Sequence, residues 1–178
     1  MTRINDNLDL IPAASQPLVA KVRGAFGTVP AMFATVANSP AALASMWGSF
    51  GALGGGTLGA KLGEAIAVAV ANRNHCEHCL AAHTALGQKA GASVEELAAA
   101  QRGIARDPRT QAALTFAIRL VDARGQVSAA DVQALRAAGF DDGQVVEVIA
   151  HVALNLFTNY VNIALDVPVD FPRVALAA

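Results

Sequence analysis

The sequence predicts an all-α protein, and three observations support this fold class. Alanine dominates the 178 residues, aromatic and β-branched residues form no long runs, and residues that start or end helices recur along the chain. Small side chains favour close packing of helices, whereas a sheet protein needs extended β-branched and aromatic segments. We expect one domain over residues 1–178. Within it, residues 1–26 form an N-terminal leader segment, which packs on a neighbouring part of the structure, and a short helix.

Proline, serine and glycine divide the first part of the chain into short helices. The first is expected over Pro17–Phe26 and ends at the following glycine. A second follows Pro30. Ser39 and Pro40 are typical of an N-cap and a first helical position, so a third helix begins there and ends at the glycines of 54–56.

Thr57 is the expected cap of the next helix, over residues 58–73. Its apolar residues recur at helical spacing, as Leu58, Leu62, Ile66 and Val70 show. Residues 65–71 also fit a buried strand. We favour helix, because alanine alternates with the β-branched residues there and no partner strand is recognisable.

Capping residues divide the second half in the same way. Ser93 and Glu96 form a capping box, and the last helix is closed by Pro168. Helices are expected from Cys76 to Gly91, from Ser93 to about Gly103, from Asp107 to about Arg124, from Ser128 to Gly139, and from about Asp141 to Leu165.

A weak internal repeat suggests a possible duplication. The segments around Gly91 and Gly139 are similar, and Glu64 precedes Cys76 by the spacing that separates Glu147 from Asn159. Asn159 and Asn162 would then replace the two cysteines in the second copy. Chance similarity in an alanine-rich chain explains the pattern equally well.

Charge and hydropathy argue against two classes of partner. The net charge is −1 and the basic residues are scattered, so neither nucleic acid nor an anionic membrane surface is an expected partner. Residues 24–60 carry no charge, but Pro30, Pro40 and several glycines interrupt them, which excludes a spanning helix. The polar N-terminus does not resemble a signal peptide, and we expect a cytoplasmic protein.

The chemistry is concentrated in residues 64–83, which hold both cysteines and three of the four histidines. On a helix, Cys76, Cys79 and His83 lie on one stripe, so His83 is placed to act as a base for Cys79. If the two helices form an antiparallel hairpin that turns near Arg73, Glu64 faces His83 and orients it. The helix dipole alone favours Cys76 as the thiolate, but we give the specific base more weight.

Other readings of these residues remain open. Zinc is the main rival to redox chemistry, because the two cysteines and neighbouring histidines are suitable ligands, although a second ligand-bearing segment is missing. The cysteines also fit two buried thiols with no further role. His78 lies off the stripe and fits a surface position. His151 fits a core or interface histidine, and no role is assigned to His75.

The spacing Glu64, Cys76, Cys79, His83 resembles the signature of the alkylhydroperoxidase D (AhpD)-like family, a branch of the carboxymuconolactone decarboxylase superfamily. The flanking segments are similar to its peroxidase-related members, so the resemblance extends from about Gly27 to Pro172. It implies a fold of paired antiparallel helices, homo-oligomers such as trimers or hexamers, and thiol-dependent reduction of hydroperoxides in antioxidant defence.

The resemblance also implies roles for residues. Cys79 becomes the sulfenic acid, Cys76 supplies a proton and closes the disulfide, and Glu64, His78 and His83 form a proton relay. No cofactor or metal is implied, and the reductant is an external dithiol, of the lipoyl type in the best-known branch. One departure is Gly63, because many relatives have arginine before the glutamate. The alternatives are a non-redox lyase of the decarboxylase type, with Glu64 and His83 as acid and base, and a metal-binding or structural oligomer.

Overall fold

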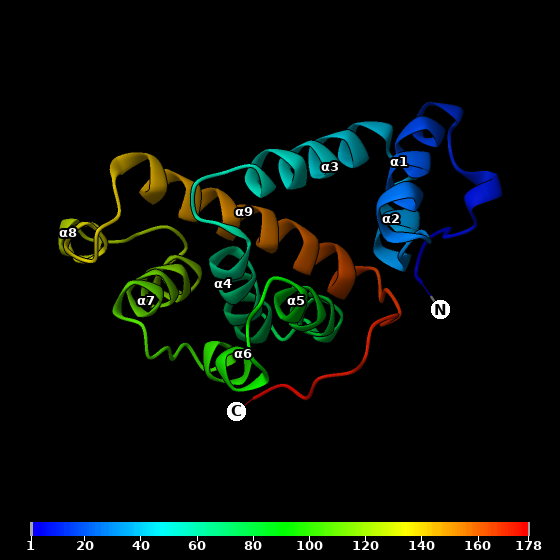
Figure 1. Ribbon diagram of the computed structural model, residues 1–178. Coiled ribbons are helices and arrows are strands. Elements are labelled where there is room, and N and C mark those ends of the chain that lie inside the picture. The colour runs from blue at the N-terminus through cyan, green and yellow to red at the C-terminus, as the bar shows by residue number, and fades with distance from the viewer. Residues whose placement is uncertain (1, 178) are drawn as a thin grey trace.

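The computed structural model describes residues 2–177, which fold into helices joined by short connections (Figure 1). Within these residues it contains no strand, and the all-α class is confirmed. The elements are the 3-10 helices η1 (Leu8–Leu10) and η2 (Ala13–Ser15), followed by α1 (Gln16–Phe26), α2 (Ala31–Val36), α3 (Pro40–Gly54), α4 (Ala60–Arg73), α5 (Glu77–Lys89), α6 (Val94–Gln101), α7 (Pro108–Asp122), α8 (Ala129–Ala137) and α9 (Asp142–Ala164).

Most helix boundaries follow the capping residues of the sequence. Gly27 ends α1 in the left-handed region, at a φ of 77°. Five of the predicted N-caps accept a hydrogen bond from the backbone N–H three residues further on, and Ser93 and Ser128 do so in complete capping boxes. The same bond is made by Ser39, Asp107 and Asp141.

The start of α4 differs from the expectation. Thr57 is not its cap, because the helix begins at Ala60 after Gly59, which has a φ of 80°. The Thr57 hydroxyl donates instead to Oε2 of Glu147, at 2.7 Å, and the Thr57 N–H donates to the same oxygen at 3.0 Å. Burial of Glu147 works against its ionisation, but these bonds and one from Leu58 lower the pKa of its carboxyl group. The α3–α4 connection is thus tied to α9.

The buried side chains form two hydrophobic clusters that share α9. The larger cluster surrounds α4 and includes residues of α5, α6, α7, α8 and the first half of α9. The smaller cluster joins α1, α2 and α3 to the second half of α9. Figure 1 shows α3 above α9, α1 and α2 together at one end of the molecule, and α4 and α5 near its centre.

Helix α4 is packed against α5, α6, α7 and α9. Residues 65–71 are therefore buried on every side and lack a polar face, which is why their pattern also fitted a strand. The alternation of alanine with larger residues allows these neighbours to approach closely. The choice of helix is confirmed.

The leader lies on its own chain. The Arg3 N–H donates to the Leu165 carbonyl at 2.8 Å, and the Ser15 hydroxyl donates to the Ala37 carbonyl at 2.7 Å. Residues 3–15 therefore connect the end of α9 to the turn after α2.

The two segments of the possible internal repeat have different structures. Glu64 lies in α4 and Cys76 lies beyond the turn that follows α4, whereas Glu147 and Asn159 lie on the single helix α9. This difference favours chance similarity for that part of the pattern.

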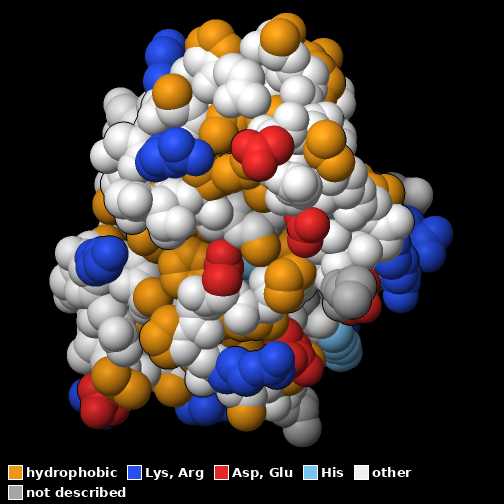
Figure 2. All heavy atoms as spheres, turned by 90° about the vertical axis from the view of Figure 1, so that its right-hand side faces the viewer, with side chains coloured by type: hydrophobic (Ala, Val, Ile, Leu, Met, Phe, Trp, Pro, Cys, Tyr) orange, Lys and Arg blue, Asp and Glu red, His pale blue; other side chains and the backbone are white. Residues whose placement is uncertain are grey.

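No helix within residues 2–177 is both long enough and apolar enough to cross a lipid bilayer. On the face toward the α1 end of the molecule, hydrophobic side chains gather near the centre and charged side chains are scattered around them (Figure 2).

Candidate active site

A tight turn between α4 and α5 presents the cysteine pair. Asn74 ends α4, and His75, which is exposed, has a positive φ of 57°. Cys76 is the N-cap of α5, and its Sγ accepts the Cys79 N–H at 3.3 Å. The Asn74 side chain donates to Oδ1 of Asn159 at 2.8 Å, which fastens the turn to α9.

Cys76 and Cys79 are joined by a disulfide. Both are buried, with exposed fractions of 1% and 3%. One helical turn separates them, so the bond lies within the first turn of α5. The pair is in the form expected of a redox-active Cys-x-x-Cys motif after oxidation.

Glu64 and His83 face each other across the α4–α5 hairpin, as the spacing predicted. Nδ1 of His83 lies 2.8 Å from Oε2 of Glu64. A carboxylate accepts, so Nδ1 carries the hydrogen and donates it, which leaves Nε2 as the basic ring nitrogen. The pair therefore has the arrangement of a general base held by an orienting carboxylate.

His78 is buried, so the surface position considered for it is wrong. Its Nδ1 lies 2.9 Å from the Pro168 carbonyl, which can only accept, so Nδ1 is protonated and Nε2 is basic. Nε2 lies 3.7 Å from Oδ1 of Asp170, and the ring meets Phe171 edge-on with centroids 6.0 Å apart. Burial lowers the pKa of His78 despite the hydrogen bond to Pro168 and the charge of Asp170.

A pocket of about 360 Å³ brings these groups together. Cys79, Glu64, His78 and His83 all line it, whereas Cys76 does not. The rest of its wall is mainly apolar and comes from the N-terminal helices and the C-terminal segment, including Phe26, Pro30, Met32, Phe33, Trp47, Phe50 and Phe171. Cys79 is therefore the sulfur that a small molecule in the pocket would meet.

Helix α9 contributes a residue that sequence reasoning did not assign to the site. Asn162 lines the pocket, is 4% exposed, and places Nδ2 3.1 Å from Sγ of Cys79. The only signal in the sequence was its place opposite a cysteine in the weak repeat. Pro168, Asp170 and Phe171 were also missed, because nothing local marks the chain after α9 as part of a pocket.

His151 lies close to the Glu64–His83 pair and was not expected there. It packs against Gly63, where an added Cβ would come within 2.9 Å of His151 Cε1. Burial lowers the pKa of His151, while the charges of Glu147 and Glu64 act in the opposite direction. The imidazole therefore takes up space that a larger side chain at position 63 would need.

The metal alternative gains no support from side-chain placement. Within residues 2–177, no three histidine, cysteine, aspartate or glutamate side chains are grouped so that they could hold a metal ion. Both cysteine sulfurs are already bonded to each other.

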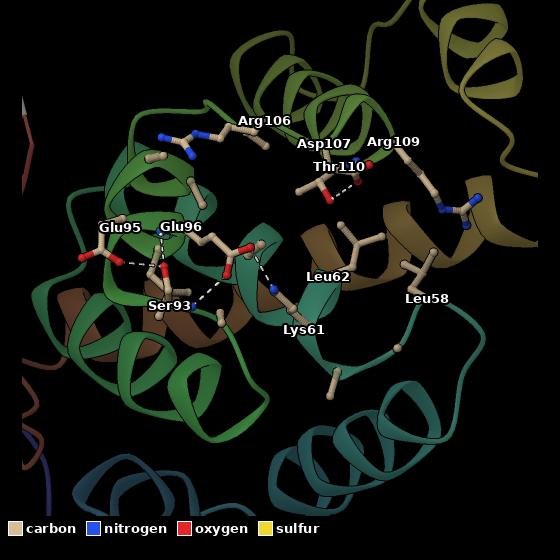
Figure 3. A pocket seen from close by; sticks show the side chains of 18 of the residues that line it. Leu58, Lys61, Leu62, Ser93, Glu95, Glu96, Arg106, Asp107, Arg109 and Thr110 are labelled. Carbon is tan, nitrogen blue, oxygen red and sulfur yellow. Dashed lines mark hydrogen bonds and ion pairs between the residues drawn. The ribbon is translucent and has the colours of Figure 1, made fainter.

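A larger groove, of about 1100 Å³, lies between the start of α4, α6 and α7 (Figure 3). Of the described residues that line it, none is a cysteine or histidine. Lys61 and Glu96 form an ion pair across it at 2.8 Å, and Thr110 donates to Asp107 at 2.7 Å. Several of its polar groups are thus paired with one another, and none of its described lining residues is a member of the cysteine pair.

Residues 40–123 match the carboxymuconolactone decarboxylase family, and this range contains the whole Glu64–His83 segment. Two crystal structures of uncharacterised peroxidase-related proteins are similar over nearly the full chain. The protein from Silicibacter sp. TM1040 is 24% identical, with 98% of this chain and 92% of that chain covered and a TM-score of 0.81. The protein from Ralstonia eutropha JMP134, described as an alkylhydroperoxidase AhpD core, is 25% identical, with 95% and 92% covered and a TM-score of 0.83.

The fold is also shared with the debrominase Bmp8. In its complex with 2,3,4-tribromopyrrole, where one cysteine is replaced by alanine, it is 17% identical, with 95% of this chain and 90% of that chain covered and a TM-score of 0.76. A comparison with curated proteins gave no match.

Proposed function

Because the chain belongs to the AhpD-like group of the carboxymuconolactone decarboxylase family, we propose that it is a thiol-dependent hydroperoxide reductase with a role in antioxidant defence. One observation carries the proposal. A disulfide-forming cysteine pair lies beside a Glu64–His83 pair, and Cys79, Glu64 and His83 line one mainly apolar pocket. A thiol and a base therefore line the same pocket, which has room for a small substrate.

The first half of the cycle oxidises Cys79. Nε2 of His83 takes the Cys79 proton, directly or through a water, and the thiolate attacks the terminal peroxide oxygen. The O–O bond breaks, the sulfur becomes a sulfenic acid, and the alkoxide leaves with the proton that His83 received. Glu64 holds the imidazole in the tautomer this transfer needs. His78, with its basic Nε2 near the same pocket, takes part in the proton relay.

The second half closes the disulfide. The Cys76 thiol attacks the sulfenic sulfur of Cys79, a sulfur–sulfur bond forms, and water leaves with the proton of Cys76. An external dithiol, of the lipoyl type in our proposal, then reduces the pair by thiol–disulfide exchange and is itself oxidised. We place this chemistry in the cytoplasm, where dithiols are kept reduced.

The test follows the sulfur oxidation states by mass spectrometry. Reduced protein treated with one equivalent of an organic hydroperoxide should form the Cys76–Cys79 disulfide. In the Cys76→Ser variant, a sulfenic-acid trap should label Cys79, and Cys79→Ser should lose peroxide turnover entirely. Undiminished peroxide turnover in Cys79→Ser would refute the thiol mechanism, whereas a non-redox activity that Cys79→Ser leaves intact would favour the lyase alternative, with Glu64 and His83 as acid and base.

The aromatic wall of the pocket favours a second candidate that uses the same thiols. Phe33, Trp47 and Phe171 would pack against a planar ring close to Cys79. In a reductive dehalogenation, the Cys79 thiolate would take the halogen from an aromatic carbon, which gains a proton. Cys76 would then displace halide and form the disulfide. Because both candidates need Cys79, only the substrate separates them, so turnover of an alkyl hydroperoxide and of 2,3,4-tribromopyrrole should be compared directly.

We also propose that the chain forms homo-oligomers, as trimers or hexamers, through the outer face of α9. This face carries an apolar stripe in a repeating three- and four-residue spacing, which matches the seam of a helix packed against another helix. Its most exposed members are Val146, Ile149, Tyr160 and Ile163, between 42% and 65% exposed. The stripe carries no charge that would oppose its packing against the same stripe on neighbouring copies, and exposed apolar side chains gathered on one helix face favour an interaction surface.

A further inference from the structure

Helix α9 turns a row of polar side chains toward the interior. They are Asn155, Thr158, Asn159 and Asn162, all 4% exposed or less. Asn155 and Thr158 donate to carbonyls of their own helix. Asn159 and Asn162 reach instead across to the α4–α5 hairpin, where the first bonds Asn74 and the second bonds Cys79.

The environment of Asn162 is unfavourable for a purely structural amide. Its Nδ2 is directed at two sulfurs, 3.1 Å from Sγ of Cys79 and 3.3 Å from Sδ of Met32. Both are weak acceptors. Its Oδ1 is buried and, among the described residues, has no hydrogen-bond partner. Asn155 and Asn159 also each bury one amide atom that has no partner among the described residues. The direction of Nδ2 toward the Cys79 sulfur is therefore what sets Asn162 apart.

The amide is better matched to the reduced site. A thiolate is a full anion and accepts an N–H far more strongly than a disulfide sulfur does. Cys76 has a different donor, the Cys79 backbone N–H, and does not line the pocket. The two sulfurs of the pair therefore differ in the side chain that faces them.

We propose that Asn162 is a catalytic residue that stabilises the thiolate of Cys79 and so selects Cys79, rather than Cys76, as the thiol that attacks. This inference rests on the proposed function for its purpose, since it names the group that makes one thiol of the pair the nucleophile. Asn159 has a separate role, because its bond to Asn74 holds the turn and touches neither sulfur. Hydrogen bonding to the charged form favours ionisation, so loss of the Asn162 amide shifts ionisation of Cys79 to higher pH.

The experiment measures the rate of iodoacetamide alkylation against pH, without any peroxide. In a Cys76→Ser background only Cys79 reports, and Asn162→Ala should move the midpoint upward by about one pH unit, a roughly tenfold lower thiolate fraction at neutral pH. Asn155→Ala is the matched control, since it removes another buried amide of α9 that contacts no sulfur, and it should leave the midpoint in place. In a Cys79→Ser background, Asn162→Ala should leave the midpoint of Cys76 unchanged.

Two results would overturn the inference: an unmoved Cys79 midpoint in Asn162→Ala, or an equal shift in Asn155→Ala. Should Asn162→Ala fail to fold, the wild-type chain still tests which of the two thiols is selected. Fragment-ion mass spectrometry of the reduced protein must show Cys79 alkylated at lower pH than Cys76, and the reverse order refutes the selection. Because alkylation needs no substrate, a chain with the predicted midpoints but no peroxide turnover would sink the proposed function and leave the role of Asn162 standing.

Discussion

Nδ1 of His83 lies 2.8 Å from Oε2 of Glu64, although the two residues belong to different helices. Because the carboxylate accepts the Nδ1 hydrogen, Nε2 is the nitrogen left to take a proton in the pocket. The contact bridges α4 and α5 close to the cysteine pair, so the orientation of the base depends on the hairpin rather than on either helix alone.

Replacing Glu64 should slow oxidation of Cys79 without unfolding the chain. In Glu64→Gln the amide can donate to Nδ1, which favours the wrong tautomer, so we expect the rate with an organic hydroperoxide to fall by about 10²- to 10⁴-fold. Stopped-flow measurement of thiol loss gives the rate. Glu96→Gln is the matched control, because Glu96 pairs with Lys61 in the separate groove, and its rate should stay at the wild-type value.

Acidification should destabilise the fold before most carboxylates titrate. Burial lowers the pKa of both His78 and His151 below the ordinary value of 6.5, despite the nearby carboxylates of Asp170, Glu147 and Glu64. Below that value the unfolded chain binds protons on these two imidazoles that the folded chain does not, so the free energy of unfolding falls as pH falls. Urea unfolding at pH 7.5 and at about pH 5.5 measures this. The double variant His78→Gln, His151→Gln should lose part of the pH dependence, and an undiminished slope would refute the assignment.

Charge on the outer face of α9 should break up the oligomer. Where the same stripes of neighbouring copies pack together, added glutamates repel one another, so Ile149→Glu with Tyr160→Glu should lower the mass measured by light scattering toward that of one 18.2 kDa chain. Val94→Glu is the control, because Val94 is as exposed as Tyr160 but lies on α6, away from the stripe. A variant that keeps the wild-type mass would show that association uses another surface.

Local chemistry made the helices and the contact between Glu64 and His83 predictable. Ser39, Ser93 and Ser128 satisfy N–H groups within three residues of themselves, so their effect can be read without knowing the fold. Glu64 and His83 are separated by one short turn, and helix geometry alone brings them together.

The residues that escaped prediction act over long distances in the chain. Thr57 has the chemistry of a cap, but its hydroxyl donates a hydrogen bond to Glu147, which is 90 residues away. Asn162 is 83 residues from Cys79, and Pro168 is 90 residues from His78. Such contacts depend on how α9 and the segment after it pack against the hairpin, and no short-range rule contains that information.

The pocket lies between the two hydrophobic clusters, so its polar groups and its apolar wall come from different parts of the chain. Glu64, Cys79 and His83 lie on α4 and α5, whose buried residues belong to the larger cluster, while much of the wall is supplied by α1, α2, α3 and the segment after α9. Substitutions at Trp47 or Phe50 would change the shape of the pocket available to a substrate and would leave the Glu64–His83 pair in place. Related proteins can therefore acquire new substrates through substitutions in the apolar wall alone. An engineer can likewise vary the wall residues in a library of variants while Glu64, Cys79 and His83 stay unchanged.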